Sequence, residues 1–194
     1  MKATEYLSAT ELQNLGLASC GRHVFISREA TICYPDQVHI GSRVRIDAFS
    51  LLIAKAPIAI GNHVHIGSSV TINAAAEVVI GDYSGLSAGT KIFTTDDDYS
   101  GAYLTGPTVD PELTNVVTAP VRLADHCIVG ANSVILPGTT LGQGVAVGAL
   151  SLVKGNLPEW GVYAGVPAKL LKPRSRELLG RLEAMTASSL ASAE

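Results

Sequence analysis

Aliphatic residues return every six positions over most of the chain. Three segments show this when aligned: "VHIGSRVRIDAFSLLIAKAP", "IAIGNHVHIGSSVTINAAAE" and "VVIGDYSGLSAGTKIFTTDD". The period of six is nested in a period of twenty, and the aliphatic positions are Ile40, Ile46, Leu52, Ile60, Ile66, Ile72, Ile80, Leu86 and Ile92. The pattern extends back through Cys20, Ile26 and Ile32. After residues 94–120 it resumes at eighteen residues per turn, with Leu123, Val129, Ile135, Leu141, Val147 and Val153.

This period excludes an α-helix and predicts a triangular coil. Six residues advance an α-helix by about 600°, so the aliphatic residues would fall on different faces. Three short strands, each with its aliphatic residue inward and a small residue at the corner, would close one coil instead, and successive coils would stack as parallel strands. We therefore expect an all-β parallel β-helix of about six coils over residues 20–172, with 94–120 extruded as a loop.

Both ends of the β-helix are followed by predicted helices. Ser8 and Glu11 form a capping box, which predicts a short helix within residues 1–19 that covers the first coil with Leu12 and Leu15. The segment 173–194 begins at a proline and contains Leu178, Leu179 and Leu182 at helical spacing. It predicts an amphipathic helix and a frayed tail, "TASSLASAE".

Composition narrows the function. The chain has 194 residues, enough for one domain, and a net charge of −3 with no basic cluster, which argues against nucleic acid or an anionic membrane surface as partner. No segment has the length of a signal peptide core or a membrane span, so we expect a cytoplasmic protein without membrane insertion. The three cysteines, Cys20, Cys33 and Cys127, lack metal-ligand spacing, and we expect buried free thiols and no metal.

The repeats and several longer motifs resemble the hexapeptide-repeat acyltransferases. The hexads, "VGANSVILPGTTLG", "VGALSLVKGNLP" and "YAGVPAKLL" are most similar to galactoside, maltose and polysaccharide O-acetyltransferases. The resemblance implies a left-handed parallel β-helix and a homotrimer with each active site between two subunits. It also implies acetyl-CoA as acyl donor, a small-molecule sugar as acceptor, and a long loop that completes the acceptor site of a neighbouring subunit.

The resemblance also assigns residues to the donor. Ala131 and Ala149 fall where the family's backbone lines the pantetheine groove. Lys169 and Lys172 fall where basic side chains lie beside the CoA phosphates, a contact that charge-assisted hydrogen bonds suit. Lys154 is displaced by one residue from the family's lysine, although we include it among the CoA-binding candidates.

The sequence departs from the family at the catalytic base. The family has a histidine five residues after the last inward aliphatic before the loop, and this position is Asp97. An aspartate pKa is normally about 3.9 and that of histidine about 6.5, so Asp97 is the poorer base at neutral pH. Three interpretations remain open. Asp97 acts with a histidine, His65 first and His126 next; or the acceptor is an amine that needs a weaker base; or the acids only solvate the loop and cap its turn through Asp98.

Five further positions form one predicted outward column, three residues after the first aliphatic of each coil: His23, Arg43, His63, Tyr83 and His126. The column could line a trimer interface or a polar solvent-facing edge. Only His126 falls in the region where γ-class carbonic anhydrases, which share the prism, would need several zinc-binding histidines. That function is therefore disfavoured.

The sequence thus predicts an acetyltransferase that moves an acetyl group from acetyl-CoA to a saccharide hydroxyl in polysaccharide or cell-envelope sugar biosynthesis. The first alternative is transfer to the nitrogen of an amino sugar or nucleotide-linked amino sugar. The second is a non-catalytic β-helix scaffold or binding protein. The catalytic candidates are Asp97, His65 and Asp98.

Overall fold

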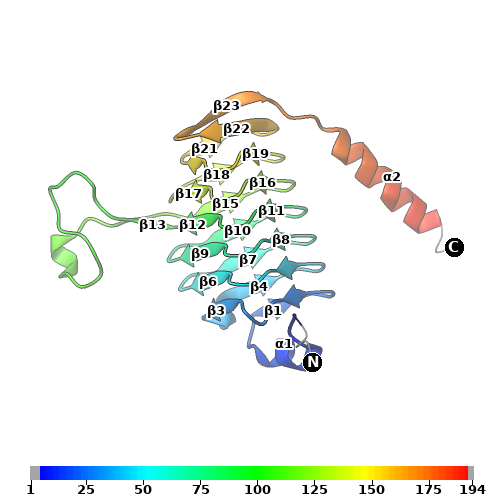
Figure 1. The fold of residues 1–194 in the computed structure, drawn as a ribbon, viewed down its shortest axis with the longest axis horizontal. Helices are drawn as coiled ribbons and strands as arrows, with labels where there is room; N and C mark the ends of the chain where they lie inside the picture. The colour runs from blue at the N-terminus through cyan, green and yellow to red at the C-terminus, as the bar shows by residue number, and fades with distance from the viewer. Residues whose placement is uncertain (1–4, 192–194) are drawn as a thin grey trace.

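Short parallel strands stack into a triangular prism, with one helix at its base and another that starts near its far end and runs back beside it (Figure 1). The structure is a computed structural model that describes residues 5–191. The first sheet of the prism has seven strands. They are β1 (Ser19–Cys20), β4 (Val38–Ile40), β7 (Ile58–Ile60), β10 (Val78–Ile80), β15 (Val121–Leu123), β18 (Thr140–Leu141) and β21 (Asn156–Leu157).

The other two faces are built in the same way. The second sheet contains β2 (Phe25–Ile26), β5 (Arg45–Ile46), β8 (His65–Ile66), β11 (Gly85–Leu86), β16 (Ile128–Val129), β19 (Ala146–Val147), β22 (Gly161–Gly165) and the antiparallel β23 (Ala168–Pro173). The third contains β3 (Thr31–Cys33), β6 (Leu51–Ala54), β9 (Thr71–Ala74), β12 (Lys91–Phe93), β17 (Val134–Ile135) and β20 (Leu152–Val153). The predicted all-β fold, a left-handed parallel β-helix, is confirmed, with about seven coils rather than six.

The hexad aliphatic residues form the core of the prism, as predicted. Ile46, Ile66 and Leu86 are paired in register on consecutive strands of the second sheet, and each is fully buried. Each buried aliphatic side chain of this size contributes about 1.5–3 kcal/mol to stability by leaving water. Because the strands are paired in register, their buried aliphatic side chains form a continuous apolar column along the prism.

The corner glycines are required by close packing between coils. Gly41 is not among the residues with positive φ, but a Cβ on it would lie 2.6 Å from the carbonyl oxygen of Gly61 in the next coil. The left-handed backbone of the same corner falls two residues later, on residues with side chains such as Arg43 (φ 60°) and His63 (φ 56°). Glycine is therefore needed at this corner for the close approach of stacked backbones and not for its conformational freedom.

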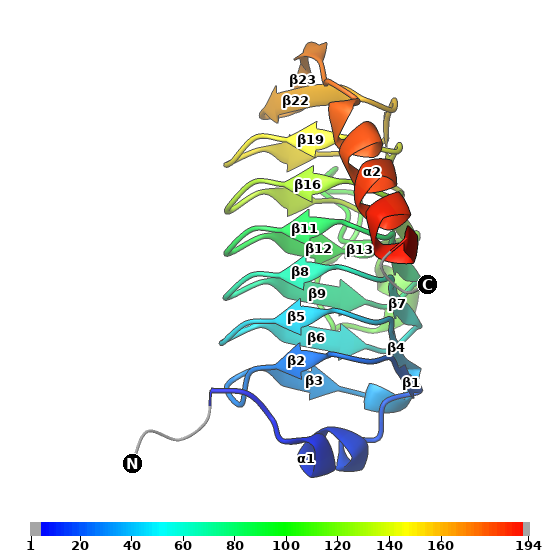
Figure 2. The same cartoon turned by 90° about the vertical axis from the view of Figure 1, so that its right-hand side faces the viewer.

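Both predicted helices are present. Helix α1 (Ala9–Asn14) carries the complete Ser8–Glu11 capping box, and Leu12 and Leu15 pack against the core. Helix α2 (Glu177–Ala191) stands away from the prism (Figure 1), and α1 lies below the first coil (Figure 2). The tail predicted as frayed is helical as far as Ala191, and residues 192–194 lie outside the described residues. No helix within residues 5–191 is long and apolar enough to cross a membrane.

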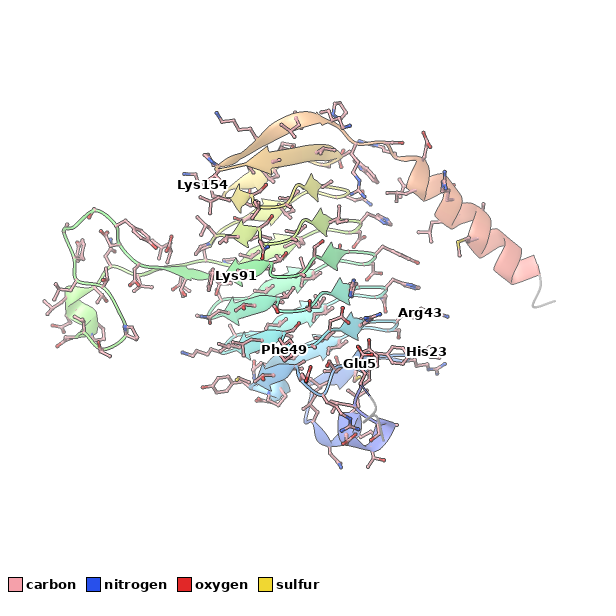
Figure 3. All side chains as sticks on the ribbon, viewed as in Figure 1. Glu5, His23, Arg43, Phe49, Lys91 and Lys154 are labelled. Atoms are coloured by element: carbon pink, nitrogen blue, oxygen red, sulfur yellow. The ribbon has the colours of Figure 1, made fainter. Side chains whose placement is uncertain are left out.

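The loop after β12 leaves the prism on the side opposite to the corners that carry His23 and Arg43 (Figures 1 and 3). The base of the loop is an antiparallel pair, β13 (Thr95–Asp96) with β14 (Val117–Thr118), and the loop contains a short 3-10 turn, η2 (Pro111–Leu113). A second 3-10 turn, η1 (Pro35–Gln37), lies between β3 and β4. The cysteines are free, as expected. Only Cys127 is buried, whereas Cys20 is exposed and Cys33 half-buried, so the prediction of burial was wrong for two of the three.

Candidate active site

The outer face of the second sheet carries one column of outward side chains. Phe25, Arg45, His65, Gly85 and Ile128 are paired in register on five consecutive strands. In a parallel sheet such residues lie about 4.8 Å apart, so each side chain contacts or frames its neighbour. A position without a side chain therefore leaves a gap in the column.

Gly85 makes such a gap. A Cβ on Gly85 would meet no atom within 4 Å, and its backbone does not have positive φ, so neither packing nor conformation requires glycine. The gap opens into a hollow of about 320 Å³ between His65 and the half-exposed Ile128. The other residues that line this central hollow are Asp47, Gly67, Ser68, Leu86, Ser87 and Ala88.

His65 is held at the edge of the central hollow by a carboxylate. Its Nε2 lies 2.7 Å from Oδ2 of Asp47, and Nε of Arg45 donates to Oδ1 of the same aspartate at 2.5 Å. Partial burial raises the pKa of Asp47, but the hydrogen bonds from His65 and Arg45 outweigh it, and the pKa lies below its ordinary value. An ionised carboxylate can only accept, so Nε2 of His65 carries the proton and Nδ1 is the basic nitrogen.

The loop acids lie elsewhere in the chain. Asp97 is exposed, and one carboxylate oxygen accepts from the backbone N–H of Gly106 at 3.4 Å. Asp98 accepts from both the N–H and the hydroxyl of Ser100 and from Nδ2 of Asn115, 2.8 Å away, and these hydrogen bonds lower its pKa. Asp98 thus ties the two arms of the loop together, whereas Asp97 keeps most of its carboxylate exposed.

Within one chain, the structure does not bring Asp97 to His65. No residue of 94–120 lines the central hollow, and the loop leaves the prism beside β12 of the third sheet (Figure 1), whereas His65, Gly85 and Ile128 lie on the second sheet. The pairing of these two candidates therefore stays a prediction that requires a second copy of the chain. His126, the next histidine candidate, lies at another corner of the prism and stacks on Tyr83.

Ala131 and Ala149, the residues predicted to line the pantetheine groove, lie above the central hollow, toward the C-terminal end of the prism. Backbone hydrogen bonds link Ser68 to Gly89, Ala88 to Asn132 and Ala131 to Leu150, which places Ala131 at the same corner two coils above Ser68. Ala149 occupies the equivalent position in the next coil and is exposed.

The predicted CoA-binding lysines lie nearer the C-terminal end of the prism. Lys169 and Lys172 are exposed on β23, the antiparallel strand that ends the second sheet. Lys154 follows β20 of the third sheet (Figure 3), so it lies on a different face from Ala149.

The predicted outward column of rings is present and longer than expected. The rings of His63 and Tyr83 stack at 4.5 Å between centroids, those of Tyr83 and His126 at 5.3 Å, and Trp160 follows His126 at 6.3 Å. The guanidinium of Arg176 lies 5.1 Å from the centre of the Trp160 ring. Trp160 lies three residues after Leu157, the first aliphatic residue of its coil, so the same three-residue spacing that predicted the other members of the column could have predicted it.

Sequence reasoning missed Asp47, Gly85 and Ser87 in the central hollow. The six-residue register contains a signal for each of them. Gly85 is equivalent to His65 one coil above, and Asp47 and Ser87 occupy the same corner position in the coils below and above Gly67. No group of three or more potential metal ligands is found in the part of the chain that the structure describes.

Comparison with known proteins agrees with this architecture. A family model described as the hexapeptide repeat of succinyl-transferase matches residues 120–149. A dTDP-4-amino-4,6-dideoxy-D-glucose acyltransferase from Escherichia coli is 37% identical over 175 residues, which cover 90% of this chain and 91% of that protein. The chain therefore belongs to the hexapeptide-repeat acyltransferases and is an acyltransferase.

Within the family, the chain is similar to enzymes that modify sugars. The structure of AntD, an N-acyltransferase from Bacillus cereus in complex with dTDP and 3-hydroxybutyryl-CoA, has a TM-score of 0.91 at 36% identity and covers 97% of this chain and 100% of that one. The putative lipopolysaccharide biosynthesis O-acetyl transferase WbbJ from Escherichia coli K12 is 29% identical, over 79% of this chain and 77% of that protein. Acyl transfer to a sugar is thus supported, and N-acylation is favoured over the predicted O-acetylation.

Proposed function

We propose that this protein transfers a short acyl group from a CoA thioester to the amino group of a nucleotide-linked amino sugar. The similarity to two enzymes of this kind, at 36% and 37% identity over nearly the whole chain, is the observation that carries the proposal. The E. coli relative is named for dTDP-4-amino-4,6-dideoxyglucose, and a point mutant of AntD was solved with that sugar nucleotide and CoA.

An amine acceptor accounts for the aspartate at the position of the family's histidine. A neutral amine attacks the thioester carbonyl without prior loss of a proton, whereas a hydroxyl needs a base as it attacks. In the reaction the C–N bond forms, the C–S bond breaks, one proton leaves the nitrogen and the CoA sulfur leaves as thiolate. Asp97 is proposed to accept or orient the ammonium proton, a task within reach of a carboxylate.

The central hollow is the proposed place for the amino sugar. Nδ1 of His65 supplies a second proton acceptor there, because the carboxylate of Asp47 fixes Nε2 as the donor. The donor would lie along the corner above, over Ala131 and Ala149. Lys169 and Lys172, with Lys154 as a weaker candidate, would neutralise the CoA phosphates at the C-terminal end of the prism.

The proposed enzyme is a homotrimer with the site shared between subunits. The loop of 94–120 extends well clear of its own prism (Figure 1), and none of its residues, Asp97 included, lines the hollow that contains His65. A loop of this kind on a rigid scaffold commonly completes a binding site. The loop of one subunit would bring Asp97 to the central hollow of the next.

The direct test uses purified protein with acetyl-CoA or 3-hydroxybutyryl-CoA and dTDP-4-amino-4,6-dideoxyglucose. Thiol release and the product mass are measured, and an amide product with release of one thiol per acyl group is expected. The matched control is the same sugar nucleotide with a hydroxyl in place of the amine. Turnover on the hydroxyl compound but not on the amine would return the assignment to O-acylation, as in the name of WbbJ.

A further inference from the structure

A second hollow lies on the same outer face, nearer to the N-terminus than the central hollow. It measures about 270 Å³ and is lined by His23, Phe25, Arg43, Val44 and Arg45. This N-terminal hollow is formed by β2 and β5 with the corners before them, and it includes none of the residues assigned above to the reaction or to CoA.

An aromatic surface borders the N-terminal hollow. Phe25 is 50% exposed, and the ring of Tyr6 meets it edge to face with 5.8 Å between centroids. The guanidinium of Arg45 covers the Tyr6 ring at 5.6 Å. The hydrophobic core does not account for an exposed phenylalanine braced in this way, but a flat apolar surface of this kind is what a nucleic acid base stacks on.

The hollow also has free positive charge. Arg43 projects from the corner that precedes β5, and Figure 3 shows it beside His23 of the preceding coil. Arg43 forms no ion pair with any residue in the described part of the chain. Two acids lie near: Asp47, which already binds Arg45, and Glu5, which lies close to Tyr6. Arg43 is therefore the guanidinium available for an anion, and its planar fork suits a phosphate.

The two hollows are contiguous along the sheet. Arg45 lines the N-terminal hollow, and Asp47, two residues further along the chain, lines the central hollow and binds Arg45. Phe25 and His65 are two strands apart in the same outward column, which is about 10 Å. When the amino group of a nucleotide-linked amino sugar reaches His65, its diphosphate and base can extend along the sheet toward Phe25.

We propose that the N-terminal hollow binds the nucleoside diphosphate part of the acceptor. In this arrangement the base rests on Phe25 and Tyr6, Arg43 binds the diphosphate, and the sugar extends into the central hollow. The donor and the acceptor then enter from opposite ends of one face, with CoA over the C-terminal coils and the nucleotide over the N-terminal coils. The inference rests on the proposed function, because it presumes a nucleotide-linked acceptor.

The test is calorimetric titration of the full chain with free dTDP and, separately, with CoA. The variants are Arg43→Gln and Phe25→Ala, and the matched control is Lys55→Gln, an exposed lysine at a different corner of the prism. We expect dTDP affinity to fall about tenfold in each variant, as loss of one charge-assisted or stacking contact would give, and to stay unchanged in Lys55→Gln. Unchanged CoA affinity in all of them verifies that the fold is intact.

Three results would overturn the inference: no dTDP binding to the wild type, unchanged dTDP affinity in both variants, or an equal loss in Lys55→Gln. Activity separates this failure from that of the proposed function. Normal amide formation with unchanged dTDP affinity in both variants would refute the N-terminal hollow alone. Loss of dTDP affinity in the variants with no amide formation by the wild type would refute the proposed function alone.

Discussion

At the scale of single residues, the central hollow depends on an absent side chain. Glycine at position 85 has an ordinary strand conformation and open space where a Cβ would lie, so a side chain there costs the fold little and fills the hollow. The same reasoning separates Gly85 from Gly41, whose substitution would drive a Cβ into the next coil.

Gly85→Val should therefore lower kcat/KM by at least about tenfold through loss of acceptor binding. The thermal midpoint should stay within a few degrees of the wild type, because valine favours strands. Steady-state kinetics and thermal denaturation measure the two effects. The matched control, Ala59→Val at an outward position of the first sheet, should leave both unchanged. Wild-type kinetics in Gly85→Val would remove the central hollow from the acceptor site.

The Asp47–His65 pair makes a prediction about coupling. If Asp47 acts by holding His65 in one tautomer, His65→Gln should lower kcat about a hundredfold, and Asp47→Asn should lower it less. The double variant should be no slower than His65→Gln alone, since Asp47 has then lost the group it positions. Additive losses in the double variant would indicate that Asp47 acts independently of His65.

At the scale of elements, the extruded loop divides its acids between two roles. Asp98 binds Ser100 nearby and Asn115 seventeen residues away, so it holds the loop closed, while Asp97 keeps most of its carboxylate exposed. Asp98→Ala should speed limited proteolysis within residues 99–115 without changing the thermal midpoint of the prism. Asp97→Asn should lower turnover but leave the proteolysis rate unchanged. An equal proteolysis rate in wild type and Asp98→Ala would show that other contacts order the loop.

The capping glutamate of helix α1 should make the stability of the fold depend on pH. Hydrogen bonds from Arg28, and then from Ser8, lower the pKa of Glu11 from 4.5 to about 2. A folded-state pKa below the unfolded value stabilises the fold above pH 4.5, and this stabilisation is lost as the pH falls toward 2. The thermal midpoint of the wild type should thus fall more steeply over this range than that of Glu11→Gln. If the thermal midpoints of the wild type and Glu11→Gln fell equally with pH, the lowered pKa of Glu11 would be contradicted.

At the scale of the whole molecule, the proposed site between subunits predicts complementation between two impaired variants. In trimers mixed from Asp97→Asn and His65→Gln chains, some sites receive His65 from one subunit and Asp97 from its neighbour. Refolding a one-to-one mixture should give about a quarter of wild-type activity if mixing is random, which is more than either variant gives alone. Activity that never exceeds the average of the two separate variants would place the whole site within one subunit.

The sequence predicted the fold well because one period fixes inward residues, corners and strand order together. Ile46, Ile66 and Leu86 could be placed from spacing alone, and so could the stack from His63 to His126. The number of coils was too low by one, because the last strands depart from the eighteen-residue spacing.

The site was harder to predict because its residues point outward, where the period fixes the position of a side chain but not the residue type. The partner of His65 is Asp47, eighteen residues earlier, and the hollow depends on a glycine that looks like any other small residue in the repeat. The choice between nitrogen and oxygen as acceptor rests on similarity to known enzymes, since an aspartate at position 97 is compatible with more than one chemistry.

In the described part of the chain, the strand ladders pair each coil with the coils directly above and below it, so the fold behaves as a linear array with nearest-neighbour coupling. Opening then starts at the two ends and moves inward, and the most slowly exchanging amides should be those of the central coils. The strands β8 and β11, which build the central hollow, lie in that middle region. Thermal fraying of either end thus leaves the central hollow in place, so the position of the proposed acceptor site along the array protects it from the commonest local unfolding.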